Sequence, residues 1–168
     1  MGKNVHKIWG WDKKKRTMIR FMKPGDIFCF RLNEDKYCFG RIIAKTVVGH
    51  IAEVFDYISE EPNIDENQVE RPLRLIEPVV LDSYSLFDEK TEGDWRIIGH
   101  QQDYSPTDME NVYFTYGFSV WCKIIDVYGN VTPISEEERS NYPLLAPKGD
   151  DYVTRLVLDK INSVGNVN

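Results

Sequence analysis

The sequence predicts an α+β fold, built mostly from antiparallel strands with one long C-terminal helix. Two observations support this prediction. Three β-rich runs joined by short links lie between residues 23 and 57, and a helical pattern of apolar residues follows residue 150. Strands grouped in one part of a chain and a helix in another are typical of the α+β class. Whether the strands close partly into a barrel is left open by the sequence.

The three β-rich runs form the centre of the predicted sheet. A Pro-Gly-Asp turn at 24–26 precedes the first run, 27–32, and the second and third runs cover 37–43 and 51–57. The three-residue link at 33–35 suits a hairpin. Short links between consecutive strands indicate an antiparallel meander, and we expect the rest of the chain to pack on it.

Further strands are expected after the meander. Residues 73–84 form a strand-like region that Pro78 interrupts, since proline cannot donate to a strand ladder. Residues 95–99 are a second short strand. Residues 112–128 are rich in aromatic and β-branched types, and Gly117 divides them or marks a bulge. A Gly-Asn turn then leads to a short run at 131–132. The aromatic residues of these strands are expected mostly in the core.

Two helical segments are predicted near the C-terminus. Ser135 and Glu138 have the spacing of a capping box, which predicts one or two helical turns. The long helix is expected over 151–163, capped by Asp150 or Asp151. Its apolar face, which should cover the sheet, consists of Tyr152, Val153, Leu156, Val157 and Ile161.

The charge is distributed unevenly along the chain. Residues 1–24 contain eight Lys or Arg residues and one Asp, a formal charge of +7, which leaves −13 for the remainder because the total is −6. An acidic body repels phosphates and steers basic proteins toward itself. Greater solubility is the simpler explanation of the same acidity.

The predicted domain organisation is simple, since 168 residues suit one domain. We expect a single globular α+β domain over 23–164, preceded by 1–22 as a basic N-terminal arm or first strand. The apolar residues of 18–22 favour the strand. The basic run 13–16 is either a nucleic-acid contact or a solvated turn, and the acidity of the rest of the chain favours the turn.

Cysteine use and hydropathy predict a cytoplasmic protein. Cys29, Cys38 and Cys122 lie in apolar strand-like segments, so we expect buried free thiols in a reducing compartment. The alternative is a disulfide between Cys29 and Cys38 across the hairpin. No apolar run is long enough to span a bilayer, and no apolar stretch follows Lys3 and Lys7 as in a signal peptide.

Motifs for catalysis and metal binding are missing from the sequence. It contains no HExxH, no paired CxxC, no GxSxG and no glycine loop for phosphate. We therefore expect no cofactor, no metal and no enzymatic activity. Asp82 is the one candidate general base, because a strand can deliver it to a cleft. The simpler expectation is that its carboxylate accepts hydrogen bonds from turn amides.

Several short motifs, in a fixed order, resemble one protein family. PGDIF at 24–28, YCFGRII at 37–43 and AEVFD at 52–56 resemble the opening of the immunity protein 26 family. The resemblance continues through VLDS at 80–83, WRIIG at 95–99 and the C-terminal helix, and covers most of 23–162. It implies a bacterial protein that is encoded beside a secreted or contact-delivered toxin and neutralises it.

The resemblance and the charge together predict stoichiometric binding to the C-terminal domain of a cognate toxin, with no role for nucleic acid or membrane. A basic, nuclease-type toxin of a contact-dependent growth inhibition or polymorphic toxin system fits the acidic body. A small-molecule hydrolase and a nucleic-acid-binding module are the alternatives. Acidic and tyrosine residues in expected loops are the candidate contacts. They are Glu60, Glu61, Asp65, Glu66, Asp82, Tyr84, Asp88, Asp103 and Tyr104.

Overall fold

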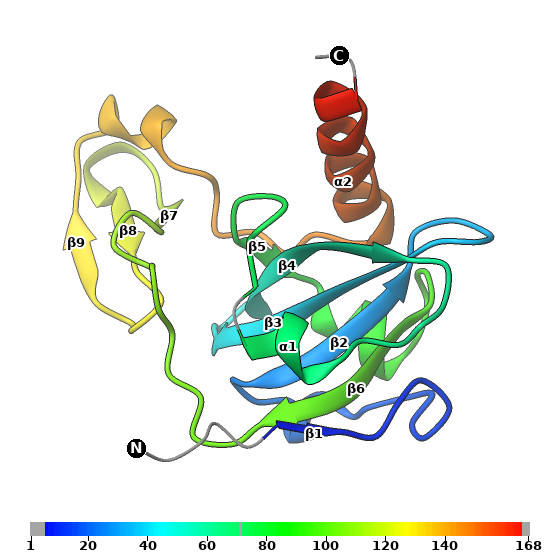
Figure 1. Cartoon of the computed structure of the whole chain (residues 1–168). Helices are drawn as coiled ribbons and strands as arrows, with labels where there is room; N and C mark the ends of the chain where they lie inside the picture. The colour runs from blue at the N-terminus through cyan, green and yellow to red at the C-terminus, as the bar shows by residue number, and fades with distance from the viewer. Residues whose placement is uncertain (1–5, 71, 166–168) are drawn as a thin grey trace.

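The computed structural model describes residues 6–70 and 72–165, and its main feature is a six-stranded sheet (Figure 1). Neighbouring strands are antiparallel in the order β1-β6-β2-β3-β4-β5. The sheet is open, with β1 and β5 at its edges, so the class is confirmed and the barrel is not formed. The strands are β1 (His6–Ile8), β2 (Asp26–Arg31), β3 (Tyr37–Lys45), β4 (His50–Ser59), β5 (Val79–Leu81) and β6 (Trp95–Gln101).

The predicted meander is confirmed as the centre of this sheet. β2 and β3 pair through the link at 33–35, and β3 pairs with β4 through a turn at 46–49. Strand β6 adds to the free side of β2 and β5 to the free side of β4. The strand-like region predicted at 73–84 is divided at Pro78: β5 pairs with β4 directly after it, and before it only an isolated bridge joins Arg74 to Phe55 of β4.

The two faces of the sheet bury two separate apolar clusters. On one face, Phe30 stacks on Trp95 with ring centroids 4.0 Å apart, and Val153 and Val157 of helix α2 (Asp150–Gly165) complete the cluster. On the other face, Phe39 and its neighbours pack against helix α1 (Glu66–Glu70). The predicted C-terminal helix is therefore confirmed and packs on the sheet through Val153 and Val157, whereas Tyr152, which was expected on the covered face, is exposed.

The cysteines are free and buried, as predicted. Cys29 lies opposite Phe39 in the ladder, whereas Cys38 lies opposite Phe30. Because side chains alternate between the faces of a sheet, the two thiols point to opposite faces and cannot bond. Burial raises the pKa of the Cys38 thiol to about 12 and that of Cys29 still further, so both thiols stay protonated.

The expected strand at 18–22 is wrong. Ile19–Phe21 is a single 3-10 turn, and β1 is the N-terminal strand instead. The reason is a long-range contact: the Thr17 amide donates to the Phe87 carbonyl at 3.0 Å, and the Ile19 amide donates to an Asp88 carboxylate oxygen at 2.9 Å. These bonds hold the segment on the turn at 84–88 and away from the sheet edge. Residues 1–5 of the predicted basic N-terminal segment lie outside the described residues.

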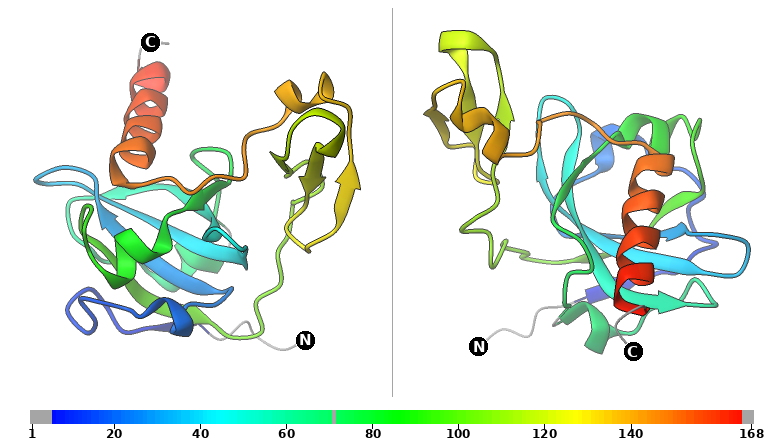
Figure 2. Two further views of the ribbon diagram at one scale, coloured as in Figure 1. Left: turned by 180° about the vertical axis from the view of Figure 1, so that it is seen from behind. Right: turned by 90° about the horizontal axis from the view of Figure 1, so that it is seen from above.

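A second, smaller sheet stands apart from the first, and we call residues 112–145 the arm (Figure 2). Its strand order is β7-β8-β9, and Gly117 separates the first two strands as predicted. The capping box is also present: the Ser135 amide donates to Glu138 Oε2 at 2.8 Å, and the Glu138 amide donates to Ser135 Oγ at 3.2 Å. The arm contains β7 (Phe114–Tyr116), β8 (Lys123–Ile125), β9 (Val131–Pro133) and 3-10 turns at Ser119–Trp121 and Glu138–Asn141.

Candidate interaction surfaces

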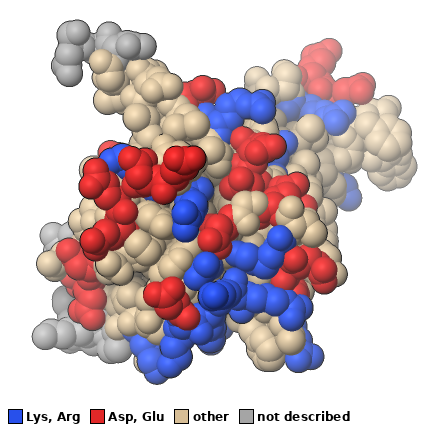
Figure 3. Space-filling view, turned by 90° about the vertical axis from the view of Figure 1, so that its right-hand side faces the viewer, with Lys and Arg blue, Asp and Glu red and all other residues tan. Residues whose placement is uncertain are grey.

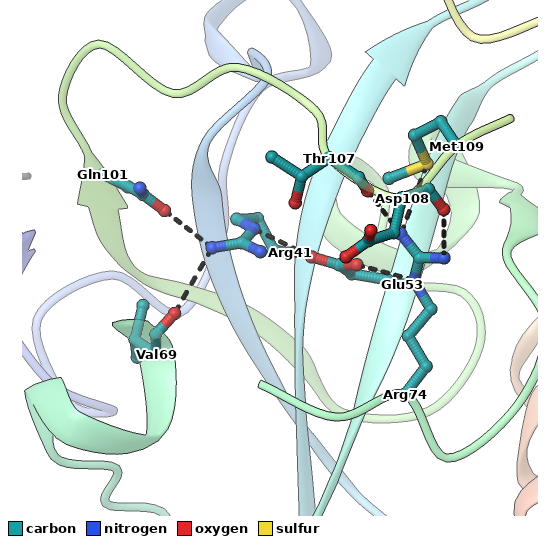
Figure 4. Close-up of polar contacts among 8 residues, drawn as sticks. All are labelled: Arg41, Glu53, Val69, Arg74, Gln101, Thr107, Asp108 and Met109. Carbon is teal, nitrogen blue, oxygen red and sulfur yellow. Dashed lines mark hydrogen bonds and ion pairs between the residues drawn. The ribbon is translucent and has the colours of Figure 1, made fainter. Parts of the chain in front are cut away.

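Three buried or half-buried charges join the two long central strands to the loops around them (Figure 4). Arg41 of β3 lies opposite Glu53 of β4 in the ladder. The Arg41 Nε donates to Glu53 Oε1 at 2.9 Å, and the Arg74 Nε donates to Glu53 Oε2 at 2.9 Å. One carboxylate is thus shared by two guanidinium groups. We call Arg41, Glu53 and Arg74 the ion clamp.

The remaining donors of the clamp hold the surrounding backbone. Arg41 Nη1 donates to the Gln101 side chain at 2.6 Å and to the Val69 carbonyl at 3.4 Å, which ties α1 to the sheet. Arg74 donates to the carbonyls of Thr107 and Asp108 at 3.1 and 3.0 Å. Buried charges are stable only when paired and hydrogen-bonded in this way. The clamp therefore fixes the loop that leads into the arm.

A polar cleft of about 750 Å³ opens above the clamp. Its rim carries the carboxylates of Glu70, Asp103 and Asp108. Tyr104 lies inside, with its ring centroid 4.5 Å from the Arg41 guanidinium carbon. Burial, and then the charge of Glu53, raises the pKa of the Tyr104 phenol to about 12, so the hydroxyl is protonated. That hydroxyl is buried and has no hydrogen-bond partner within the described part of the chain.

The sequence did not reveal the ion clamp, although it carried a signal. Arg41 and Glu53 interrupt two apolar strand runs, FGRII and IAEVF. A charge in the middle of a buried strand needs a partner of opposite sign, and adjacent strands of a hairpin provide one. Arg74 carries no comparable signal, because it lies in an irregular segment and reaches Glu53 only through the fold.

The acidic loop residues after β4 are exposed, as expected, and their contacts are local. Glu60 pairs with Lys36 at 3.1 Å, and Glu61 accepts a bond from the neighbouring Asn63. The Asp65 carboxylate accepts the Gln68 amide at 3.1 Å and so caps α1, which begins with Glu66. Of these residues, Glu60 lies beside the β2–β3 loop, whereas Asp65 and Glu66 lie at the start of α1.

The candidates between 82 and 88 lie elsewhere on the molecule. Asp82 accepts the Ser85 amide at 3.3 Å, which matches the turn role and not the general-base role. Tyr84 is exposed and donates to Glu89 at 2.8 Å. The expected exposure of Asp88 is wrong: it is buried, and the Ile19 amide and then Arg16 lower the pKa of its carboxyl group. Its carboxylate faces the N-terminal segment because the π-helical turn Tyr84–Asp88 turns it inward.

The candidate contacts thus fall into three groups. Asp103 and Tyr104 share the polar cleft, while the residues at 60–66 and those at 82–88 belong to other regions of the surface. The sequence placed all nine residues in one list because they share a chemical type. The structure brings only the first pair together at one concave site.

The basic N-terminal run lies on one side of the body, where Figure 3 shows Lys and Arg gathered beside Asp and Glu. Lysines 13–15 are exposed. Two cations pack on aromatic rings here: Lys14 of the run lies 4.9 Å from the Trp9 ring centroid, and Arg96 of β6 lies 4.0 Å from that of Trp11. Arg16 pairs with Asp88. The run is therefore attached to the sheet as a turn with both signs of charge around it.

A groove of about 1030 Å³ lies between α2 and the segment that returns from the arm. Apolar side chains line much of it, among them Ile76, Leu144 and Leu156. Within the described residues, no group of three or more His, Cys, Asp or Glu side chains is arranged to hold a metal ion. None of the described helices is long and apolar enough to cross a membrane.

Comparison with known proteins adds one finding. A family model described as Immunity protein 26 matches residues 23–123, which cover the sheet from β2 to β6 and the first part of the arm. The matched segment includes Arg41, Glu53 and Arg74. No curated protein and no solved structure matches the chain.

Proposed function

From the premise that this chain belongs to the immunity protein 26 family, we propose that it neutralises a cognate bacterial toxin by stoichiometric binding. The partner is the C-terminal domain of a toxin delivered by secretion or by contact, as in contact-dependent growth inhibition. The binding takes place in the cytoplasm of the producing cell, where an incoming toxin would act. The protein changes no covalent bond of its partner.

The family match is the observation that carries this proposal. The acidic net charge of the chain, −6, supports a cationic partner: residues 25–168 carry −13, and residues 1–24 offset this with +7. Proteins that act on nucleic acids present Lys and Arg to phosphates, so a nuclease-type toxin has a surface that complements this body. Occlusion of that surface would block the toxin without any chemistry in the inhibitor.

The ion clamp supports binding in preference to catalysis. A general base needs a carboxylate that is able to take up a proton near neutral pH. Glu53 is the carboxylate at the base of the polar cleft, and both of its oxygens accept bonds from arginines. Asp82, the other candidate base, accepts a turn amide. The clamp orders loops that a partner can contact, which is a structural role.

Calorimetry with the toxin domain encoded beside this chain tests the proposal. We expect one-to-one binding with a Kd of about 10⁻⁹ M at low salt. Association should slow as salt rises from about 0.05 M to about 0.5 M, because salt screens the steering charges. An absence of binding at low salt would disprove the proposal.

Charge reversal distinguishes the contribution of the acidic loop to the association rate from the contribution of the protein's net charge. The double variant Glu60→Lys/Glu61→Lys should slow association if the loop faces the toxin. The matched control Glu34→Lys/Asp35→Lys makes the same change in net charge on the neighbouring hairpin loop, where both residues are also exposed. Equal slowing by both variants would assign the effect to net charge, and unchanged rates in the first would remove residues 60–61 from the interface.

A further inference from the structure

The end of the arm presents a compact group of large apolar side chains to solvent. Phe118, Val120 and Trp121 lie in and beside the 3-10 turn between β7 and β8, and they are 70, 82 and 69% exposed. We call these three residues the apolar tip. The sequence predicted a core position for most aromatic residues of this stretch, and for Phe118 and Trp121 that expectation is wrong.

The tip is exposed although residues next to it in the arm are buried. Cys122, the next residue in the chain, is buried, and so is Phe114 on the paired strand. Phe114 joins a cluster with Ile43 and Ile51 of the large sheet, which attaches the arm to the body. The change from exposed Trp121 to buried Cys122 therefore reflects a defined turn, and the apolar side chains lie on the outer side of that turn.

The backbone of the turn holds these side chains outward. Gly117 has a φ of +83°, and a Cβ at that position would collide with the Trp121 carbonyl oxygen. Ser119 also has a positive φ, +55°, which is uncommon for a residue other than glycine. The Trp121 amide donates to the Phe118 carbonyl at 3.0 Å and closes the turn. Pre-ordered side chains lose less entropy when they bind.

Acidic residues lie beside the apolar tip. The Ile134 amide donates to the Cys122 carbonyl at 3.0 Å, so the segment that follows Ile134 begins next to the turn. That segment contains Glu136, Glu137 and Glu138, all exposed. Figures 1 and 2 show the two turns at the same end of the arm. An apolar centre with a charged rim is the usual composition of a protein interface.

We propose that the apolar tip is the anchor that inserts into an apolar pocket on the toxin domain, with the Glu136–Glu138 turn facing cations at the rim of that pocket. This inference rests on the proposed function, because the family supplies the class of partner. Two observations favour this occupant. The acidic rim complements a cationic protein, and the segment matched by the family model, residues 23–123, contains the whole tip. Aromatic anchors in pockets supply most of the energy of many interfaces.

The test compares toxin binding by wild-type protein and by Phe118→Ser/Trp121→Ser. We expect binding to weaken at least about 30-fold, mostly through faster dissociation, because loss of a hot spot costs about 2 kcal/mol or more. The matched control is Tyr128→Ser, an aromatic residue that is 62% exposed at the opposite end of the arm, and its affinity should stay within about twofold of wild type. Circular dichroism and the Tm report whether each variant is folded.

The rim is tested separately with Glu136→Lys/Glu137→Lys. We expect slower association at low salt, with a smaller effect on dissociation. The charge-matched control is again Glu34→Lys/Asp35→Lys. Equal slowing by the two double variants would overturn the assignment of the rim, because the effect would then come from net charge.

The outcomes distinguish this inference from the proposed function. If wild-type protein does not bind the toxin domain, the proposed function fails. If wild-type protein binds and the folded tip variant binds equally well, the proposed function stands and the tip assignment fails. Light scattering adds one more outcome: a wild-type dimer that becomes a monomer on tip substitution, with toxin binding unchanged, would show that a second copy covers the tip.

Discussion

The large sheet and the arm use the same residue types in opposite ways. In the sheet, Phe28, Phe30 and Trp95 are fully buried and in mutual ring contact. In the arm, Phe118 and Trp121 are mostly exposed. Burial of an aromatic side chain contributes about 1.5–3 kcal/mol to folding, so the first group stabilises the protein and the second contributes little. The difference separates a region that maintains the fold from a region available for contact.

Charges follow the same division. The body pairs the buried charges of the ion clamp and holds Asp88 with Arg16 and the Ile19 amide. The arm leaves the carboxylates of Glu136 and Glu137 in solvent. A paired buried ion is costly to disturb, whereas an exposed one is available to a partner.

The largest expected effect comes from exchanging one tryptophan in each region. Trp95→Ala should lower the free energy of unfolding by about 4 kcal/mol, since it leaves a cavity beside Phe28 and Phe30. Trp121→Ala should change it by less than about 0.5 kcal/mol. Urea denaturation followed by circular dichroism measures both. A large loss of unfolding free energy with Trp121→Ala would mean that the apolar tip stabilises the fold. The proposed difference between the sheet and the arm would then be wrong.

The ion clamp provides the second test. Glu53→Ala should lower the free energy of unfolding by about 3 kcal/mol, because it leaves the buried Arg41 and the half-buried Arg74 without their carboxylate. Glu60→Ala removes a carboxylate from an exposed pair and should cost less than about 1 kcal/mol. The same denaturation experiment measures both variants. Similar losses for the two would contradict a structural role for the clamp.

A third test concerns the burial of His50 in the body and its effect on stability as pH falls. Burial, and then the charge of Lys45, lowers the pKa of His50 to about 4. Unfolded histidine titrates near about 6.5, so the unfolded chain takes up the proton first as pH falls. This contribution to stability is complete above pH 6.5 and is lost toward pH 4. Between pH 7.5 and pH 5 the loss should be about 2 kcal/mol.

The variant His50→Gln should lack this part of the pH dependence. All other titrating groups are common to the two proteins, so the difference between their pH profiles of unfolding isolates His50. Identical profiles would mean that water reaches the imidazole, and that this corner of the body resembles the exposed arm.

The smallest expected effect concerns the capping box of the arm. Ser135→Ala should lower the local opening free energy at the Glu138 amide by about 0.5–1 kcal/mol, because that amide loses its acceptor. Hydrogen exchange measures this opening, and the global free energy of unfolding should stay within about 0.5 kcal/mol. An equal fall in both quantities would show that the arm and the body unfold as one unit.

Features fixed by local chemistry were predictable from the sequence. The meander followed from apolar runs and a Pro-Gly-Asp turn, and α2 followed from its 3.6-residue pattern. The capping box at Ser135 and Glu138 was also recognised correctly. In each case the residues that decide the structure are neighbours along the chain, so their pattern is sufficient.

The misjudged features depend on contacts between distant residues. The segment at 18–22 is not a strand because residues 87 and 88 bind its backbone, and the same contact buries Asp88. The ion clamp needs Arg74 to reach Glu53 across 21 positions. Phe118 and Trp121 carry a core-like pattern, and only the turn at Gly117 and Ser119 directs them outward. Composition alone does not indicate which apolar side chains remain outside.

Because the apolar tip lies on a solvent-facing turn, its residues can be substituted during evolution. Substitutions at surface positions usually alter stability by no more than about 0.5 kcal/mol. Phe118, Val120 and Trp121 can therefore be exchanged for residues of other shapes while the sheet continues to fold. When the toxin changes, the end of the arm can therefore change by single substitutions, and the protein remains folded at each step.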